Sequence, residues 1–387
     1  MIKTELKTNP SQHQYRDYSF YLEAPNYTIS AHNVTHEIHD YNAHAPLKHQ
    51  VTDHFEQAKK LGIHSPYIVG AFPFETDKPP YLFIPEKVHI TSKSQRTGKK
   101  QPLSPFQNAP RLTETPSRKE YMNLVDEALH KMNTSDLKKV VLSRTLQIES
   151  DDVIGIDELI TNLAEHNPEG YTFSTDLGNE KKLTGASPEL LVSLYQGLVT
   201  ANPLAGSRPR SNDPIEDRRR ADELRHSSKD HHEHKLVIDT VAEALQPLCV
   251  DMSIPKMPEL IQTETMWHLS TEVTGKVDPK QNLTSVDLAL ALHPTPAICG
   301  TPEHLAKDQI KAEPFDRNFF TGMVGWNNYE GDGEWVVSIR CAEVSSHNIQ
   351  LFAGAGIVEG SHPEDELRET SAKFETMLRA MGSKTME

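Results

Sequence analysis

The spacing of hydrophobic residues predicts several helices in this chain. Between Ser117 and Met132 apolar side chains recur with the period of a helix, and Ser117 is suited to cap its first turn. The same period runs from Ser227 or Ser228 to Leu248. A last helix is expected to be capped at Ser361.

The residues from Asp213 onward carry the signals of a further helix N-terminus. Asp213 is a candidate N-cap, and Pro214 occupies the first helical position, where its missing N–H costs nothing. Glu216 stands where it would complete a capping box. We therefore expect a helix to begin at this point.

Runs of β-branched and aromatic residues predict strands between these helices. The expected strands are 67–72, 81–84, 139–144, 190–194, 198–201, 335–340 and 349–353. The expected strands 190–194 and 198–201 flank Gln196-Gly197, which indicates a hairpin. The polar stretch from Ser92 to Pro116 is expected to be a long surface loop. Strands and helices mix without a regular βαβ order, which favours an α+β fold.

Composition narrows the class of protein. The 387 residues are 36% hydrophobic and 25% charged, as in ordinary globular proteins. A net charge of −15 argues against nucleic acid or an anionic membrane as the main partner. Three widely spaced cysteines indicate neither a disulfide framework nor a zinc site. The sequence shows no 18-residue apolar run and no signal segment, so a cytoplasmic location is expected.

Two pairs of carboxylates are the clearest chemical signal. Asp230 and Glu233 form one pair and Glu366 and Glu369 the other, each at the i, i+3 spacing that places both side chains on one helix face. Four converging carboxylates repel one another unless a cation lies between them. Oxygen ligands suit a hard ion such as Mg²⁺. The pairs are therefore candidate metal ligands.

A second interpretation of these carboxylates stays open. Acidic residues are common in the first turn of a helix because they oppose its dipole, and Asp230 and Glu366 fit that explanation equally well. Glu233 lies on the inward stripe, where an unpaired carboxylate is costly. The neighbouring histidines fit no helical ligand pair, so we interpret them as surface residues.

Other residues offer acid, base and anion-binding chemistry, each with an ordinary structural alternative. Lys139 begins an apolar strand, where a desolvated amine can act as a base, although strand-end lysines usually reach solvent. Glu189 precedes an apolar strand, where burial can raise its pKa toward that of a general acid. Arg340 is the last residue of an expected strand. Its guanidinium could bind a ligand carboxylate through two hydrogen bonds, or form an ordinary surface ion pair. Gly354-Ala355-Gly356 lies between a strand and a helix and suits close approach of an anion, or a turn with positive φ.

Several short motifs occur in an order that resembles a known family. They lie at 139–144, 185–190, 203–207, 228–234, 293–300, 338–340 and 353–358. In this order they resemble the chorismate-utilising enzymes and, within them, isochorismate synthases of the siderophore (2,3-dihydroxybenzoate) type. The resemblance is strong over residues 118–381 and loose over residues 1–117. It implies a single domain over residues 1–387 with an α+β fold of two similar halves, in which large antiparallel sheets are flanked by helices.

The resemblance also implies a role for each candidate residue. Glu233 and Glu369 would bind Mg²⁺ directly, and Asp230 and Glu366 through water. Lys139 would be the base that activates water, and Glu189 the acid that protonates the departing hydroxyl. The expected substrate contacts are Ser207, Ala297, Ile298, Ile339, Arg340, Gly354, Ala355, Gly356 and Lys373.

A few positions bear on the subfamily. By resemblance, Lys139 and Ala297 favour water over ammonia as the nucleophile, so no glutamine amidotransferase subunit is expected. We expect the protein to be a monomer, with chorismate as its substrate. Salicylate synthase, a menaquinone-pathway isochorismate synthase and a binding relative without catalytic activity remain alternatives.

Overall fold

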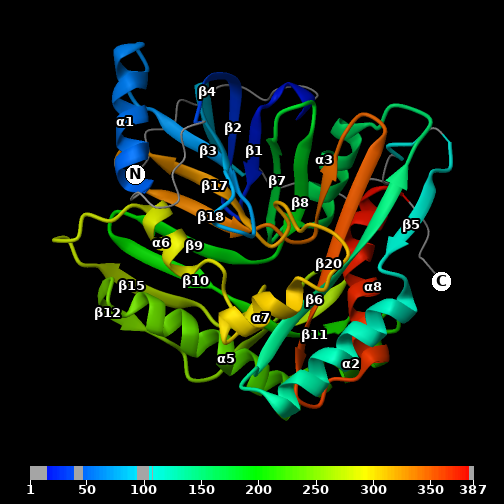
Figure 1. Ribbon diagram of the computed structural model, residues 1–387. Helices are drawn as coiled ribbons and strands as arrows, with labels where there is room; N and C mark the ends of the chain where they lie inside the picture. Colours follow the sequence, from blue (N-terminus) through cyan, green and yellow to red (C-terminus); the bar gives the residue numbers. More distant parts are fainter. Residues whose placement is uncertain (1–14, 39–46, 94–103, 107, 383–387) are drawn as a thin grey trace.

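Seventeen strands form one continuous antiparallel sheet in the computed structural model, which describes residues 15–38, 47–93, 104–106 and 108–382 (Figure 1). The strands pair in the order β12, β15, β10, β9, β18, β17, β3, β4, β2, β1, β7, β8, β19, β20 and β6, with β5 and β16 both on the far edge of β6. A separate sheet consists of β11, β14 and β13.

The strands have the following bounds: β1 Phe20–Glu23, β2 Tyr27–Glu37, β3 Tyr67–Phe72, β4 Tyr81–Ser92, β5 Arg111–Thr115, β6 Lys139–Glu149, β7 Tyr171–Asp176, β8 Lys182–Ser187, β9 Leu190–Tyr195, β10 Leu198–Asn202, β11 Leu204–Pro209, β12 Cys249–Ser253, β13 Glu259–Gln262, β14 Met266–Ser270, β15 Val273–Val277, β16 Gly300–Thr301, β17 Met323–Asn328, β18 Gly333–Val337, β19 Cys341–Val344 and β20 Asn348–Val358. The helices are α1 Leu47–Lys60, α2 Arg118–Thr134, α3 Ile156–His166, α4 Pro214–His226, α5 Ser228–Leu245, α6 Ser285–Leu292, α7 Glu303–Ile310 and α8 Pro363–Ala380, with a 3₁₀ turn at Tyr15–Asp17.

The long sheet folds back on itself around an inner core. Successive side chains of a strand point to opposite faces, and inward residues from both halves of the strand order meet in this core. Val336 comes from β18 in the first half of the order and Phe83 from β4 at its middle, while Phe173, Leu183 and Phe352 come from β7, β8 and β20 in the second half. Burying both inner faces against each other removes apolar surface from water, which is the main favourable term in folding.

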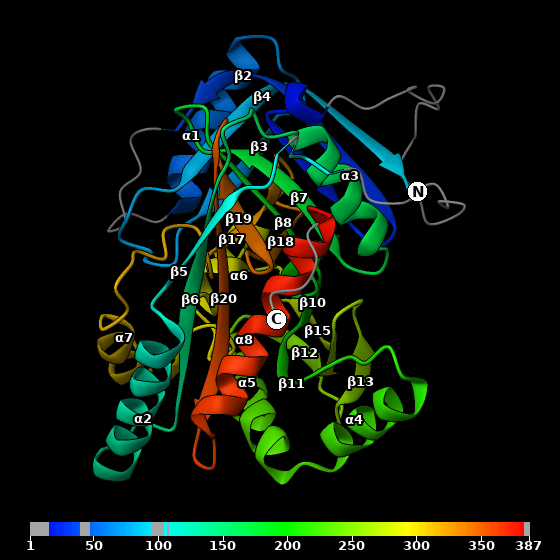
Figure 2. The ribbon, with the colours of Figure 1, turned by 90° about the vertical axis from the view of Figure 1, so that its right-hand side faces the viewer.

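Helices cover the outer faces of the folded sheet. α1, α5 and α6 pack on the face formed by β3, β9, β10, β15 and β18. α3 and α8 pack on the opposite face, over β6, β8, β19 and β20. Figure 2 shows α8 running beside β6 and β20. The fold class predicted from the sequence, α+β with large antiparallel sheets flanked by helices, is confirmed.

Elements with local signals form where the sequence predicts them. Ser117 caps α2 in a capping box with Glu120. β9 and β10 form the expected hairpin, and Gln196 and Gly197 at its turn both have positive φ (50° and 81°). This is the geometry that two-residue hairpin turns require.

Several expected boundaries and caps are wrong. Part of the stretch from Ser92 to Pro116 is strand β5, which pairs with β6, while residues 94–103 and 107 lie outside the described residues. α5 ends at Leu245 rather than Leu248. The N-cap of α8 is His362 rather than Ser361, whose hydroxyl accepts the Val358 N–H instead.

The expected capping box at α4 is also wrong. Asp213 does cap the helix, since its carboxylate accepts the Ile215 N–H. Glu216 instead accepts hydrogen bonds from Arg219 and Arg220 one turn later. Charged partners of this kind compete with the backbone for a carboxylate.

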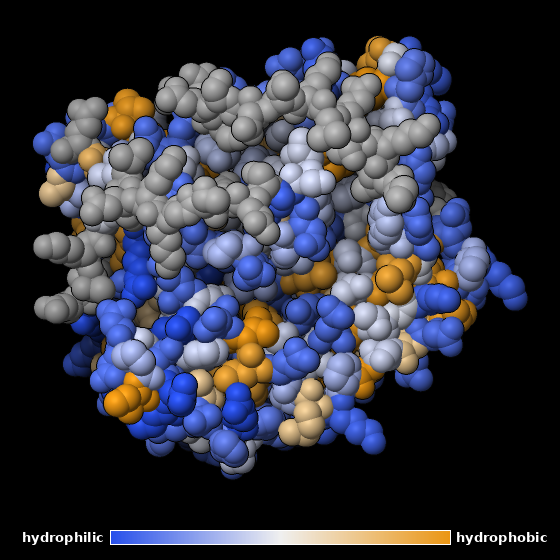
Figure 3. Space-filling view, turned by 180° about the vertical axis from the view of Figure 1, so that it is seen from behind, coloured by the Kyte–Doolittle hydropathy of each residue, from blue (hydrophilic) through white to orange (hydrophobic). Residues whose placement is uncertain are grey.

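No helix within the described part of the chain is long and apolar enough to cross a membrane. The face in Figure 3 shows hydrophobic residues in small groups among hydrophilic ones wherever it is coloured.

Candidate active site

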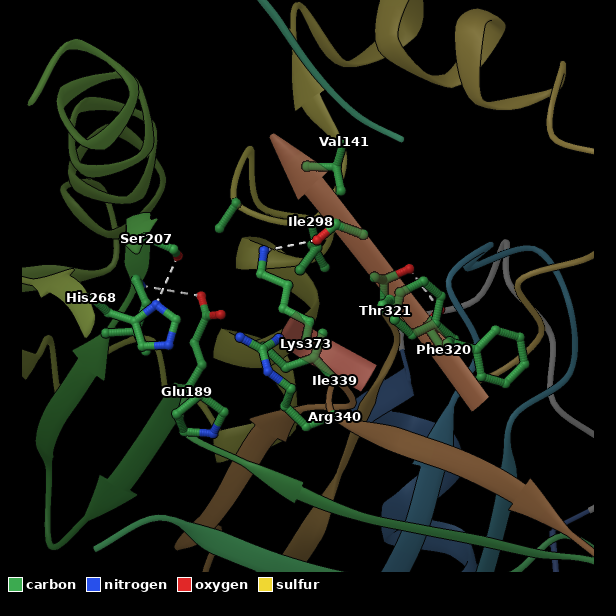
Figure 4. Close-up of a pocket in the computed structure, with 16 residues that line it drawn as sticks. Val141, Glu189, Ser207, His268, Ile298, Phe320, Thr321, Ile339, Arg340 and Lys373 are labelled. Atoms are coloured by element: carbon green, nitrogen blue, oxygen red, sulfur yellow. Dashed lines mark hydrogen bonds between the residues drawn. The ribbon is translucent and has the colours of Figure 1, made fainter. Parts of the chain in front are cut away.

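One pocket collects residues from both halves of the strand order. Its volume is about 520 Å³, the open mouth included. β6, β11, β14, β20 and α8 each contribute to the lining, together with the residues just before β9 and the connections around residues 297–298, 320–321 and 339–340. Figure 4 shows Glu189, Arg340 and Lys373 projecting toward one another from three different elements.

Most of the predicted substrate contacts line this pocket. The lining includes Glu189, Ser207, Ala297, Ile298, Ile339, Arg340, Gly354 and Lys373. Ala355 and Gly356 do not line it, and neither do Lys139 and the four candidate metal ligands. Ala355 lies on the opposite face of β20 from Phe352 and Gly354, which line the pocket, because successive strand residues face opposite sides.

Glu189 has the environment of a general acid. It is a buried residue just before β9, and its carboxylate accepts a long hydrogen bond of 3.4 Å from the Leu204 N–H. Burial raises its pKa to about 7, although this N–H and the charges of Lys139, Arg340 and Lys373 oppose the shift. A carboxyl that keeps its proton near neutral pH is able to donate it to a leaving group.

Arg340 and Lys373 make the pocket electropositive. Burial lowers the pKa of Arg340 to about 10, which leaves the guanidinium charged at neutral pH. Among the described residues no carboxylate forms an ion pair with Arg340, whereas Lys373 binds Glu369 at 2.6 Å and the Gly354 carbonyl at 2.8 Å. A buried cation facing a cavity without an acidic partner suits an anionic ligand.

The position of Arg340 differs from the expected one. The strand predicted over 335–340 ends at Val337, and Arg340 lies in the connection to β19 with φ of 50°. Non-glycine residues rarely adopt this conformation. The left-handed backbone at Arg340 is therefore a tertiary feature that strand periodicity does not predict.

Lys139 lies behind the pocket lining, in a buried ion pair. Its ammonium is 2.8 Å from Glu233 Oε1, and the Lys139 side chain is 1% exposed. Burial opposes ionisation of Glu233, but Lys139 outweighs it and lowers the pKa of this carboxyl. Val141, on the same face of β6, does line the pocket, and the Lys139 charge acts on Glu189. The base and acid candidates are therefore close enough for the charge of one to act on the other, although only Glu189 lines the pocket.

The Gly354–Gly356 segment is strand rather than turn. β20 continues to Val358 and pairs with β6 throughout, so the expectation of a segment between strand and helix is wrong. A Cβ at Gly356 would collide with the Glu233 carboxylate, and one at Gly354 would lie 2.7 Å from Ser143 Oγ. Glycine is needed at Gly356 to leave room for the Lys139–Glu233 pair.

Each candidate metal ligand is paired with a cation of the protein. Beside the Lys139–Glu233 and Lys373–Glu369 pairs, Arg208 binds Asp230 at 2.6 Å and Lys229 binds Glu366 at 2.8 Å. As these side chains stand, no three His, Cys, Asp or Glu residues in the described ranges are close enough together to hold a metal ion.

The electrostatics of this cluster nevertheless fit a divalent ion. Burial and the neighbouring charge of Glu369 raise the pKa of Glu366 to about 7. Burial opposes the charge of Lys229, but Glu366, Glu233 and Glu369 outweigh it and raise the pKa of this ammonium. Four carboxylates on α5 and α8 therefore surround protein cations, and an all-oxygen donor set of this kind suits a hard ion.

Sequence reasoning missed several residues of the pocket. His268 on β14 lines it, and its Nδ1 lies 2.8 Å from Ser207 Oγ. Burial and the charges of Arg340 and Lys373 hold the pKa of His268 well below its usual value, so the ring is neutral. Phe320 and Thr321 also line the pocket. An inward polar residue in the strand 266–270 was the available signal for His268.

The fold and the pocket together define the class of protein. Residues 82–382 match the family described as "Chorismate binding enzyme". The chain belongs to this family of chorismate-binding enzymes. The resemblance stated from the sequence motifs is confirmed.

Individual relatives are similar over nearly the whole chain. Isochorismate synthase DhbC of Bacillus subtilis is 46% identical over 400 residues, which cover 98% of each chain. The vibriobactin-specific isochorismate synthase of Vibrio cholerae is 40% identical and covers 99% of this chain and 94% of its own. A crystal structure described as a putative 2,3-dihydroxybenzoate-specific isochorismate synthase, DhbC from Bacillus anthracis, matches with a TM-score of 0.89 at 46% identity, covering 95% and 97% of the two chains.

Proposed function

We propose that this protein is an isochorismate synthase of the siderophore type, an isomerase that converts chorismate to isochorismate. The observation that carries the proposal is the convergence of Glu189, Arg340 and Lys373 on one pocket, in a chain 46% identical to a relative named for this activity. The names of two relatives, specific for vibriobactin and for 2,3-dihydroxybenzoate, support a role in catechol siderophore synthesis.

The proposed reaction exchanges one hydroxyl group of the ring for another. Lys139, which in this structure is the ammonium paired with Glu233, acts after it has given up that proton: as the amine it takes a proton from the water that attacks C2 of chorismate. The ring double bonds shift, and the C4 hydroxyl departs with the proton of Glu189 as a second water molecule. Both groups are needed because hydroxide is a poor leaving group and neutral water a poor nucleophile. One water enters and one leaves, which conserves atoms and charge.

The pocket supplies binding groups for both carboxylates of chorismate. Arg340 offers a planar fork of donors that matches a carboxylate, and Lys373 adds a second charge in the same pocket. Ser207, held by the neutral ring of His268 at 2.8 Å, offers a hydroxyl at the opposite wall. These contacts orient the ring between Lys139 and Glu189, and orientation is itself a large part of catalysis.

A bound Mg²⁺ would neutralise the ring carboxylate of the substrate among the acidic residues. Glu233 and Glu369 would hold the ion directly, and Asp230 and Glu366 would do so through water. The support lies in the donor type, and the protein cations now paired with these four carboxylates would have to give way to the ion.

Substitution of Glu369 with glutamine is expected to weaken Mg²⁺ binding in the absence of chorismate. Loss of a ligand should cost at least the roughly 10–100-fold in affinity that loss of an outer-sphere partner costs. Calorimetric titration of the two proteins with Mg²⁺ measures this change. The matched control is Glu364→Gln, an exposed carboxylate on the first turn of α8. Equal affinity in the Glu369 variant and the wild type would remove Glu369 from the ligand set.

We also propose that the chain works as a single domain and as a monomer in the cytoplasm, without an amidotransferase subunit. Strands β1–β4, which precede residue 117, pair with β7 and β17 in the main sheet. Obligate interfaces need large apolar patches, and the face drawn in Figure 3 shows hydrophobic residues in small groups where it is coloured. The three cysteines are free, which fits a reducing compartment. Light scattering of the purified protein tests the oligomeric state.

Product identification tests the main proposal. Purified protein incubated with chorismate and Mg²⁺ should yield isochorismate by liquid chromatography, with no added ammonia and no partner protein. Salicylate together with an equivalent of pyruvate would instead identify a salicylate synthase. Chorismate binding without any turnover would identify a relative that binds but does not catalyse.

A further inference from the structure

Among the strands of the described residues, none lies beside part of the β6 edge next to the pocket. β16 consists of Gly300 and Thr301 and pairs only with Val140 and Lys139. Beyond this point β6 continues through buried residues. Their backbone groups on this edge need hydrogen-bond partners, because an unpaired buried carbonyl or N–H is costly.

Two side chains take the place of the missing strand. Arg317 donates from Nη2 to the Val141 carbonyl at 2.7 Å, and Glu313 Oε1 accepts the Ser143 N–H at 2.7 Å. Arg317 and Glu313 also bind each other through Nε at 2.8 Å and Nη2 at 2.6 Å. The pair therefore satisfies the donor and the acceptor that β16 leaves unpaired.

The same guanidinium reaches two further segments of the chain. Arg317 Nη1 donates to the Ile298 carbonyl at 3.0 Å and contacts Thr321 Oγ1 at 3.5 Å. Val141, Ile298 and Thr321 all line the pocket, and they come from three separate segments. Arg317 is 3% exposed and lies over the ring of Phe74 at 4.8 Å, so its own position is set by packing.

We propose that Arg317 is a positioning residue that holds one wall of the active site. It does not line the pocket. It acts through the backbone of Val141 and Ile298 and through the hydroxyl of Thr321, and so sets the distance between β6 and the 297–298 connection. This inference rests on the proposed function, because the wall it positions is the wall of the chorismate pocket.

Lysine cannot replace this arginine. An ammonium carries its three donors on one atom, whereas the guanidinium spreads five donors over a planar fork. A lysine side chain in its place would not be able to reach Val141, Ile298 and Glu313 together, so at least one lining segment would move. A displacement of about 1 Å in an active site can cost roughly 10²-fold in rate.

The test compares Arg317→Lys with a matched substitution of a second buried arginine, Arg144→Lys. Arg144 is fully buried on β6 between the rings of Tyr121 and Phe374, and its side chain does not line the pocket. KM and the dissociation constant of chorismate are measured for each protein, together with its melting temperature. KM does not depend on how much of the sample is folded. The dissociation constant does not either, once the protein concentration is corrected for the folded fraction.

Arg317→Lys is expected to raise KM and the dissociation constant by about tenfold or more and to lower kcat/KM by roughly 10²-fold. Arg144→Lys is expected to lower the melting temperature while both constants stay at wild-type values. A purely structural role for Arg317 would lower only stability and yield, and that result would overturn the proposal. Equal rises in KM in the two variants would overturn it as well.

The experiment distinguishes failure of the Arg317 proposal from failure of the proposed function. If the wild type binds chorismate but forms no isochorismate, the proposed reaction fails. The dissociation constants of the two variants still decide whether Arg317 positions the pocket.

Discussion

Replacement of Lys139 with methionine is expected to lower turnover of chorismate by roughly 10²–10⁴-fold, the usual contribution of a general base. Methionine has about the length of the lysine stem but cannot take a proton from water. The measurement is the initial rate of isochorismate formation at saturating chorismate and Mg²⁺. The matched control is Lys138→Met, which removes the neighbouring exposed lysine and should leave turnover unchanged.

Loss of the Lys139 ammonium also affects stability. Glu233 would remain buried without its partner at 2.8 Å, and breaking a buried pair in this way costs about 3–5 kcal/mol. Lys139→Arg separates the two effects, because arginine keeps the positive charge for Glu233 but stays protonated and cannot act as a base. Wild-type turnover in a folded Lys139→Arg protein would refute the assignment of the base.

Replacement of Glu189 with glutamine is expected to lower turnover by a similar factor, roughly 10²–10⁴, and to change the pH profile. The pKa of Glu189 is raised to about 7 by burial. Because the protonated form is the acid, ionisation of Glu189 should lower wild-type kcat/KM about tenfold per pH unit above pH 7, relative to the trend that the Lys139 base sets. Glutamine does not titrate, so the decline near pH 7 should disappear from the residual activity.

A second buried carboxyl provides the control for this assignment. Burial also raises the pKa of Glu334 to about 7, and its Oε1 accepts a hydrogen bond from the Tyr27 hydroxyl at 2.7 Å, away from the pocket. Glu334→Gln should therefore keep both turnover and the decline above pH 7. If the decline vanished in the Glu334 variant and persisted in Glu189→Gln, Glu189 would not be the acid.

Stability should follow the same titration with a definite sign. The pKa of Glu189 is higher in the folded protein than its ordinary value of 4.5. Folding therefore favours the protonated form, and its contribution to stability is lost as the pH rises toward 7. The free energy of unfolding of Glu189→Gln should accordingly rise relative to the wild type between these two pH values.

Elements with short-range signals were predictable from the sequence. The capping box joins Ser117 and Glu120, which are three positions apart, and the turn of the β9–β10 hairpin lies within Gln196-Gly197. Local hydrogen bonds and local dihedral preferences decide such features. Strand lengths were less predictable: β20 extends to Val358 because it pairs with β6 along its full length.

Candidate chemistry was predictable by residue type but not by position. Glu189, Arg340 and Lys373 were identified and do share a pocket, while Lys139 lies behind its lining and Ala355 faces away from it. The Ser207–His268 hydrogen bond joins residues 61 positions apart, and the Arg317–Val141 bond joins residues 176 apart. Neither contact leaves a periodic or local signature.

By itself, the sequence determined the class of fold, the family and the residue types that carry acid, base and carboxylate chemistry, because helix periods, turns and ordered motifs are properties of neighbouring residues. Only the tertiary structure decided which of these groups face one pocket, which are buried enough for their pKa to shift, and how Arg317 substitutes for a strand beside β6. Burial and long-range pairing exist only once distant segments have packed together, since it is this packing that removes the groups from water.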